Sequence, residues 1–126
     1  MPITQSLFIF TALPCEAKPL IDHYRLKKET SIHAFSLYRK DAITLTVTGI
    51  GKTAMAAGVA YTHAKFAEAT NPVILNIGIA GHRTENLGLM FLADKITDAD
   101  SGRHYYPPLA FTLPCSTLAL QTHAKP

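Results

Sequence analysis

Two long apolar runs, LFIFTAL at residues 7–13 and VILNIGI at residues 73–79, constrain the fold more than any other feature of this sequence. A continuous apolar run of this length is typical of a strand that is buried on both faces, as in the sheets of α/β proteins. Between the two runs, apolar residues first recur at helical spacing, then alternate with polar residues, then return to helical spacing. The elements expected there are a helix, a hairpin and a second helix, at 16–24, 34–48 and 53–69.

This order of elements predicts the α/β class, with a mixed, mostly parallel twisted sheet and helices on both faces. A further strand is expected within residues 88–97. From about residue 101 the chain holds four of its eight prolines and no clear periodicity, so an irregular tail is expected. The 126 residues most simply form one domain, residues 1–126, and 48% apolar content is sufficient for a packed core.

Charge, cysteine and histidine content argue against several functional classes. The net charge is only +3 and the one basic cluster, at residues 25–28, is expected to be solvated surface, so no nucleic-acid partner is expected. Cys15 and Cys115 lie far apart, which fits a reducing cytoplasm. The run at 7–13 is too short for a membrane span and lacks the basic residues that precede a signal sequence. The six histidines show no zinc-binding spacing, so neither a metal nor a cofactor is expected.

Three glycine-containing or helix-starting segments follow predicted strands. They are LPCE at 13–16, TGIG at 48–51 and GIAG at 78–81. Ligands of open α/β sheets bind at the carboxyl ends of the strands. These three segments are therefore expected to converge on one binding site.

The segment TGIGKT suggests a phosphate-binding P-loop as one alternative. Gly51, Lys52 and Thr53 match the end of the G-x-x-x-x-G-K-[ST] pattern, and a strand and a helix flank them as required. The first glycine of the pattern is replaced by Thr46, whose β-branched side chain favours an extended backbone. We therefore expect Thr46 to prolong the strand, which disfavours a phosphate cradle.

The same segments, in the same order, resemble motifs of the purine nucleoside phosphorylase and nucleosidase superfamily. TALPCE carries the family's acidic residue at the start of the first helix, TGIGK at 48–52 is similar to S-G-[IV]-G-K, and NIGIAG at 76–81 is similar to N-x-G-x-A-G. A glycine-led strand with an acidic end follows. The closest likeness is to the methylthioadenosine/S-adenosylhomocysteine nucleosidase branch, and it spans about residues 6–108, which correspond to the first half of the family's domain.

The resemblance implies a purine nucleoside as ligand and assigns roles to individual residues. Glu16 would be catalytic, because the matching glutamate holds and helps activate the attacking water. The residues implied to bind substrate are Thr48, Gly49, Ile50, Gly51, Asn76, Gly78, Ile79, Ala80 and Gly81. From the residues alone, a simpler interpretation stays open: the glycines only permit tight turns, and Glu16 only stabilises a helix start.

Two positions bear on whether water or phosphate is the nucleophile. Asn76 stands where hexameric phosphorylases tend to have a phosphate-binding arginine, and an amide binds a dianion poorly, which favours hydrolysis. Ile79 stands where nucleosidases usually have a hydroxyl residue, so the usual substrate is in doubt. Phosphate therefore remains a second candidate ligand.

The family's second half brings a Met-Glu segment for the ribose and an aspartate that protonates the leaving purine, and nothing after Ser101 matches either. The expectation is a shortened phosphorylase/hydrolase-like fold that is impaired as a catalyst when alone. A non-catalytic nucleoside-binding or assembly module is the alternative. Self-association, or a partner that supplies the missing half, is expected to cover the exposed apolar surface.

Overall fold

A computed structural model describes residues 5–109 and 111–124 of the chain. The described residues form two compact units, the first ending at Ala80 and the second beginning at Gly81. The prediction of one domain over residues 1–126 stays a prediction, and it includes residues 1–4, 110 and 125–126, which lie outside the described residues.

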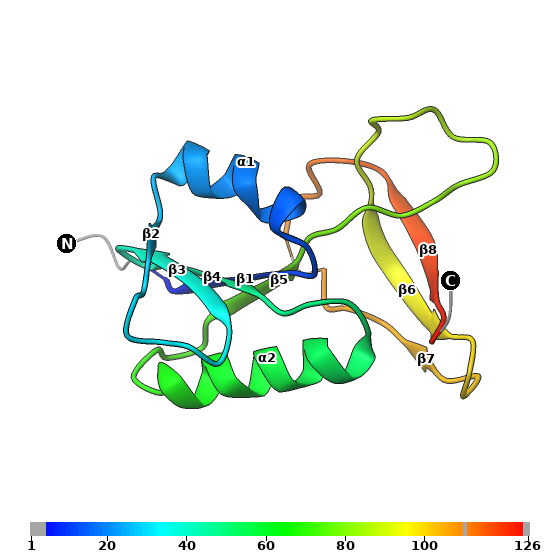
Figure 1. The fold of residues 1–126 in the computed structure, drawn as a ribbon. Coiled ribbons are helices and arrows are strands. Elements are labelled where there is room, and N and C mark those ends of the chain that lie inside the picture. The colour runs from blue at the N-terminus through cyan, green and yellow to red at the C-terminus, as the bar shows by residue number, and fades with distance from the viewer. Residues whose placement is uncertain (1–4, 110, 125–126) are drawn as a thin grey trace. The chain divides into compact units, whose positions relative to one another are not determined.

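The first unit is a five-stranded sheet with a helix on each face (Figure 1). Its elements are β1 (Leu7–Thr11), α1 (Pro14–Tyr24), β2 (Lys27–Lys28), β3 (Ser36–Lys40), β4 (Ile43–Val47), α2 (Lys52–Lys65) and β5 (Val73–Asn76). The strand order is β2-β3-β4-β1-β5. β1 pairs in parallel with both β4 and β5, while the β3–β4 hairpin and the β2–β3 pair are antiparallel. The predicted α/β class, mixed sheet and two-sided helix cover are confirmed.

The two cores follow from the alternation of side chains along β1. Phe8 and Phe10 face α2 and pack with Leu37 and Phe66, whereas Ile9 faces α1 and packs with Ala17. Because neither face of β1 is open to water, its apolar run needs no polar alternation.

The buried face of α2 differs from the apolar face that periodicity predicts. Helical spacing in the sequence puts Ala56, Ala60 and His63 on one face with Val59 and Phe66, which predicts that this face is buried. In the structure Ala56, Ala60 and His63 are exposed, and the fully covered positions before the helix end are Gly58 and Thr62. The Thr62 hydroxyl bonds the Thr46 hydroxyl at 2.8 Å and donates to the Gly58 carbonyl oxygen at 2.8 Å. A buried pair of hydroxyls has no signature in an apolar pattern, which explains the error.

The second apolar run, residues 73–79, was expected to be a strand buried on both faces. This prediction is wrong, because the strand is shorter and partly exposed. β5 ends at Asn76 and lies at the edge of the sheet, with Val73 42% and Ile74 46% exposed. Its one strand partner within the unit is β1.

The second unit holds a three-stranded sheet, where the sequence predicted only one strand and an irregular tail. Its strands are β6 (Leu92–Asp98), β7 (His104–Tyr105) and β8 (Thr117–Thr122), in the order β7-β6-β8. β6 pairs in parallel with β8 and antiparallel with β7. The region after residue 101 is therefore not wholly irregular. β7 has two residues and β8 lacks regular alternation, which leaves little for a sequence pattern to detect.

Candidate functional site

The three predicted motifs follow the carboxyl ends of three neighbouring parallel strands. β1 lies between β4 and β5, and Phe10 of β1 is in register with Thr46 on one side and Asn76 on the other. The turn after β1 and the segments after β4 and β5 therefore leave the same edge of the sheet, as ligand-binding segments do in α/β proteins.

Glu16 joins the first of these segments to the third. One carboxylate oxygen, Oε1, accepts a hydrogen bond from the backbone N–H of Leu13 at 2.9 Å, and this bond stabilises the start of α1. The other oxygen, Oε2, accepts the backbone N–H of Ile79 at 2.9 Å. A carboxylate has about four acceptor positions, so these two bonds leave capacity for a water molecule or a sugar hydroxyl.

Gly78 allows the approach of the Glu16 carboxylate. A Cβ at this position would lie 3.1 Å from Oε2, closer than most real Cβ contacts. This gives Gly78 a structural reason to lack a side chain, independent of any ligand.

Two backbone hydrogen bonds join the segment that follows β4 to the turn that follows β1. The N–H of Thr48 donates to the Thr11 carbonyl oxygen at 2.9 Å and the N–H of Gly49 donates to the Ala12 carbonyl oxygen at 3.0 Å. Gly49 and Gly51 then adopt φ values of 92° and 105°, which glycine adopts without steric cost. The two glycines thus turn the chain from β4 into α2 and leave Ile50 78% exposed between them.

Thr48 is fixed against α2 through Gly58. The Thr48 hydroxyl donates to the Gly49 carbonyl oxygen at 2.9 Å, and its methyl carbon lies 2.4 Å from where a Cβ on Gly58 would stand. The orientation of Thr48 at the strand end therefore depends on the absence of a side chain at Gly58, in the second turn of α2. Sequence reasoning missed Gly58, because a helical glycine carries no signal of what it contacts.

The remaining predicted residues lie at the end of β5. Asn76 is its last residue, and Ile79 follows with an 84% exposed side chain. Ala80 ends the first unit, while Gly81 begins the second, so the structure leaves the position of Gly81 relative to Glu16 undescribed. Contacts thus join Glu16 to the 78–79 segment, and their role in binding substrate stays a prediction.

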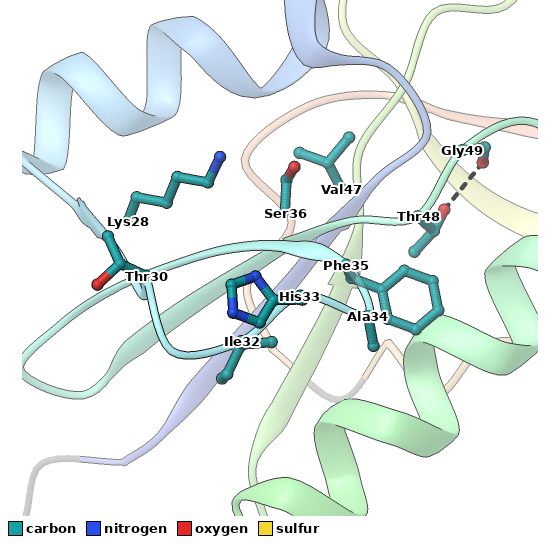
Figure 2. Close-up of a pocket in the computed structure, with 10 residues that line it drawn as sticks. All are labelled: Lys28, Thr30, Ile32, His33, Ala34, Phe35, Ser36, Val47, Thr48 and Gly49. Carbon is teal, nitrogen blue, oxygen red and sulfur yellow. Dashed lines mark hydrogen bonds between the residues drawn. The ribbon is translucent and has the colours of Figure 1, made fainter.

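A groove of about 540 Å³ adjoins the Thr48–Gly49 turn (Figure 2). Glu16 and Ile50 are not among its lining residues. The side chains and backbone that line it are Lys28, Thr30, Ile32, His33, Ala34, Phe35, Ser36, Val47, Thr48 and Gly49. Sequence reasoning found Thr48 and Gly49 and expected the basic cluster near Lys28 to be solvated surface. Lys28 is exposed, as expected, and it also borders the groove. The segment 29–35 has no periodicity that could have signalled a groove wall.

The structure disfavours the alternative of a P-loop. Thr46 lies inside β4, paired on both sides, so its backbone is extended where a P-loop glycine would open the phosphate cradle. In residues 5–109 and 111–124, no three or more His, Cys, Asp or Glu side chains gather as metal ligands. Among the same residues, no helix has the length and apolarity needed to cross a membrane.

Comparisons with known proteins support the fold. No protein-family model matches the chain, and no curated protein matches it. Among solved structures, it is similar to an aspartate-to-asparagine mutant of the Helicobacter pylori MTAN, an MTA nucleosidase, determined with 5'-methylthioadenosine in the active site. The TM-score is 0.59 and the sequence identity 19%, over 78% of this chain and 44% of that chain. The chain therefore has a nucleosidase-like fold and spans less than half the length of this relative.

The two hydrogen bonds of Glu16 predict a measurable cost for its removal. We expect Glu16→Ala to lower the free energy of unfolding by about 1–3 kcal/mol, because two backbone donors lose a charged acceptor. We expect Glu16→Gln to cost less, since its amide oxygen still accepts one bond. Urea unfolding followed by circular dichroism measures both values, and hydrogen exchange at the Ile79 amide should accelerate in Glu16→Ala. Glu68→Ala, at an exposed position, is the control. Unchanged exchange at Ile79 would contradict the described contact.

The Thr48–Gly58 contact predicts a coupled pair of substitutions. We expect Gly58→Ala to destabilise the protein by about 1–3 kcal/mol, because overpacking outweighs the better helix propensity of alanine. Adding Thr48→Ser removes the clashing methyl group, keeps the hydroxyl, and should recover part of the loss. Thermal or urea unfolding of the two single variants and the double variant gives the coupling energy. Gly81→Ala, which meets open space, is the matched control. Additive effects of the two substitutions would show that the contact is not tight.

Proposed function

We propose that this chain forms the nucleoside-binding strand ends of a purine nucleosidase-like protein that cleaves the N-glycosidic bond with water. The observation that carries the proposal is the 2.9 Å bond from the Ile79 N–H to Glu16 Oε2 on a nucleosidase-like fold. It brings together Glu16, the acid–base candidate at these strand ends, and the segment proposed to contact the purine.

Cleavage of an N-glycosidic bond passes through an oxocarbenium-like state, so the site must supply a nucleophile and stabilise positive charge. Glu16 can do both when ionised: its unused lone pairs accept hydrogen bonds from water, and its charge favours the developing cation. Asn76 carries no charge at the end of β5, which favours water over phosphate as the nucleophile.

Apolar surface for the sugar and base is available in the segments that follow β4 and β5. Ile50 and Ile79 expose 78% and 84% of their side chains at the strand ends, where a ligand could cover them. The small residues Gly78 and Ala80 let a flat ring approach the backbone. The H. pylori protein holds 5'-methylthioadenosine, and we propose a purine nucleoside for this chain as well.

One observation favours a non-catalytic nucleoside-binding module as the second candidate. Both oxygens of Glu16 already accept backbone N–H bonds, which is what a purely structural glutamate at a helix start does. The sequence also offers no match to the family's leaving-group acid, whose loss typically costs about 10²–10⁴-fold in rate. We propose that the activity of this chain alone is correspondingly low.

The two cysteines are free, which supports our proposal of a cytoplasmic location.

The proposed function predicts nucleoside binding with little turnover. Calorimetry with 5'-methylthioadenosine, adenosylhomocysteine, adenosine and inosine should show binding of at least one, and chromatography should show slow release of free base. Glu16→Gln should abolish residual release without abolishing binding, because an amide cannot take up a proton from water. Glu68→Gln serves as the control, and each assay is run with and without phosphate.

The outcomes separate the candidates. Absence of binding to all four nucleosides would overturn the proposed function. Binding with no release that depends on Glu16 would establish the module without catalysis, and release that requires phosphate would replace water as the nucleophile.

The exposed edge of the first sheet predicts self-association. β5 leaves one row of backbone hydrogen-bonding groups without a strand partner inside the unit, and Val73 and Ile74 are nearly half exposed. We expect light scattering to show at least two copies per particle, and Ile74→Lys to shift the population toward monomer. Leu87→Lys, at a fully exposed loop position, should have no such effect. A monomer at micromolar concentration would contradict this and leave a separate partner as the expected cover.

A further inference from the structure

A second groove, of about 610 Å³, lies at the opposite end of the parallel strands from Glu16. It is formed by the start of β1, the turn between β3 and β4, and the segment that follows α2. Figure 1 shows α2 ending at the side of the first sheet where β1 begins. The Leu7 N–H donates to the Ala42 carbonyl oxygen at 2.8 Å, which ties the turn to β1. This second groove belongs to the first unit and shares no residue with the predicted nucleoside site.

The side chains of the second groove converge on the α2 face of the sheet. Phe8 lies in the core on this face. Arg39 is in register with Thr44, and its Nε donates to the Thr44 hydroxyl oxygen at 3.1 Å. The guanidinium carbon of Arg39 lies 3.9 Å from the centroid of the Phe66 ring, which packs in the same core as Phe8. The residues that follow α2 close the groove from this side as well.

Arg39 is fixed in orientation without an acidic partner. Phe66 covers one face of its guanidinium group and Thr44 uses its Nε, which leaves four N–H bonds on the two Nη atoms. Within the described part of the chain, no carboxylate forms an ion pair with Arg39. Because its plane is already set, the guanidinium can bind both oxygens of a carboxylate at a low entropic cost.

The second groove also carries negative charge. Asp41, in the β3–β4 turn, and Glu68, after α2, both line it and are exposed. Since neither is paired with Arg39, opposite charges are kept apart around one space. The two carboxylates disfavour a dianion such as phosphate, whereas a ligand that bears both a carboxylate and a cationic group matches both signs of charge.

Size and spacing narrow the class of ligand. Arg39 and Asp41 are two residues apart in one hairpin, which favours a ligand whose two charges are separated by few bonds. Phe8, Ala42 and Ala69 supply apolar lining between the charged groups. The volume of about 610 Å³ lies in the range of small-molecule sites. An α-amino acid with an apolar side chain has this combination of groups.

We propose that the second groove binds a free α-amino acid with an apolar side chain. Arg39 binds the α-carboxylate through its Nη atoms, and Asp41 accepts hydrogen bonds from the α-ammonium group. The inference goes beyond the proposed function and does not depend on it, because the two sites lie at opposite ends of the strands. The contact with Asp41 contributes less to affinity than the contact with Arg39, since Asp41 is open to water.

NMR titration of the full chain, labelled with ¹⁵N, tests the proposal and locates the site. The probes are leucine, 4-methylpentanoate, which lacks the ammonium group, leucinamide, which lacks the carboxylate, and inorganic phosphate. We expect leucine to shift the amide signals of Asp41, Ala42 and Ala69 and to leave that of Ile79 in place. Leucine should bind about threefold more tightly than 4-methylpentanoate and about tenfold more tightly than leucinamide.

Variants at two adjacent residues of β3 separate the groove from net charge. Arg39→Gln should lower the affinity for leucine about tenfold. Lys40→Gln makes the same change of charge at an exposed residue that alternates to the other face and does not line the groove, so it should have no such effect. Because Arg39 also packs on Phe66, Arg39→Lys is the second variant: it keeps the charge, loses the planar fork and should still weaken binding severalfold.

The acidic partner is tested in the same way. Asp41→Asn retains a residue that tolerates the φ of 53° at this turn and should remove the advantage of leucine over 4-methylpentanoate. Asp22→Asn, at an exposed position on α1, is the matched control and should preserve that advantage.

Four results would overturn the proposal. They are the absence of leucine-dependent shifts in the second groove at millimolar concentration, equal binding of leucine and 4-methylpentanoate, tighter binding of phosphate than of leucine, and equal effects of Arg39→Gln and Lys40→Gln. None of them bears on the proposed function, which is tested with nucleosides at residues outside this groove. Failure of nucleoside binding would likewise leave the amino-acid site in place.

Discussion

The position of β1, buried on both faces and paired in parallel on both edges, is the constraint on which the candidate site depends. Its side chains alternate between two cores, and its hydrogen bonds fix the register of β4 and β5 at the same edge of the sheet. The three motif segments meet because these strands end together. No long-range side-chain contact is needed to bring them to this edge, only parallel pairing around one apolar strand.

Glu16 and Thr48 then fix the positions of these segments relative to one another more closely than strand pairing alone does. The carboxylate of Glu16 bonds the first turn of its own helix and the segment that leaves β5, so it sets the separation of these two segments. Thr48 is held by backbone pairing, by its own hydroxyl and by close packing on Gly58. Both residues therefore have structural roles that are compatible with a ligand site and do not by themselves require one.

Sequence patterns predicted the fold where burial alone decides structure, as in the apolar run of β1 and the alternating hairpin of β3 and β4. They failed where a polar or small residue is buried for a specific partner. Thr62 is buried because Thr46 and a helix carbonyl satisfy its hydroxyl, and Gly58 is buried because Thr48 occupies the space of its side chain. The segment of β5 is apolar yet lies at an edge, since hydrophobicity does not reveal how many strands pair with it. The wall of the groove beside Thr48 is held by Ile32, which packs with Phe8 and Phe10, and by Phe35, whose ring lies 5.5 Å from the ring of Tyr61. These partners are far away in the sequence, so the contacts leave no periodic trace.

The packing of Thr48 on Gly58 also restricts how this sequence can diverge. A larger residue at position 58 becomes acceptable only after position 48 has lost its methyl group, whereas serine at position 48 is tolerable with glycine still in place. Substitutions at the two sites must therefore accumulate in one order, threonine to serine first. Descendants of this chain with alanine at position 58 should pass through an ancestor that already had a smaller residue at the strand end, so the composition of α2 would limit which residues can occupy the turn after β4.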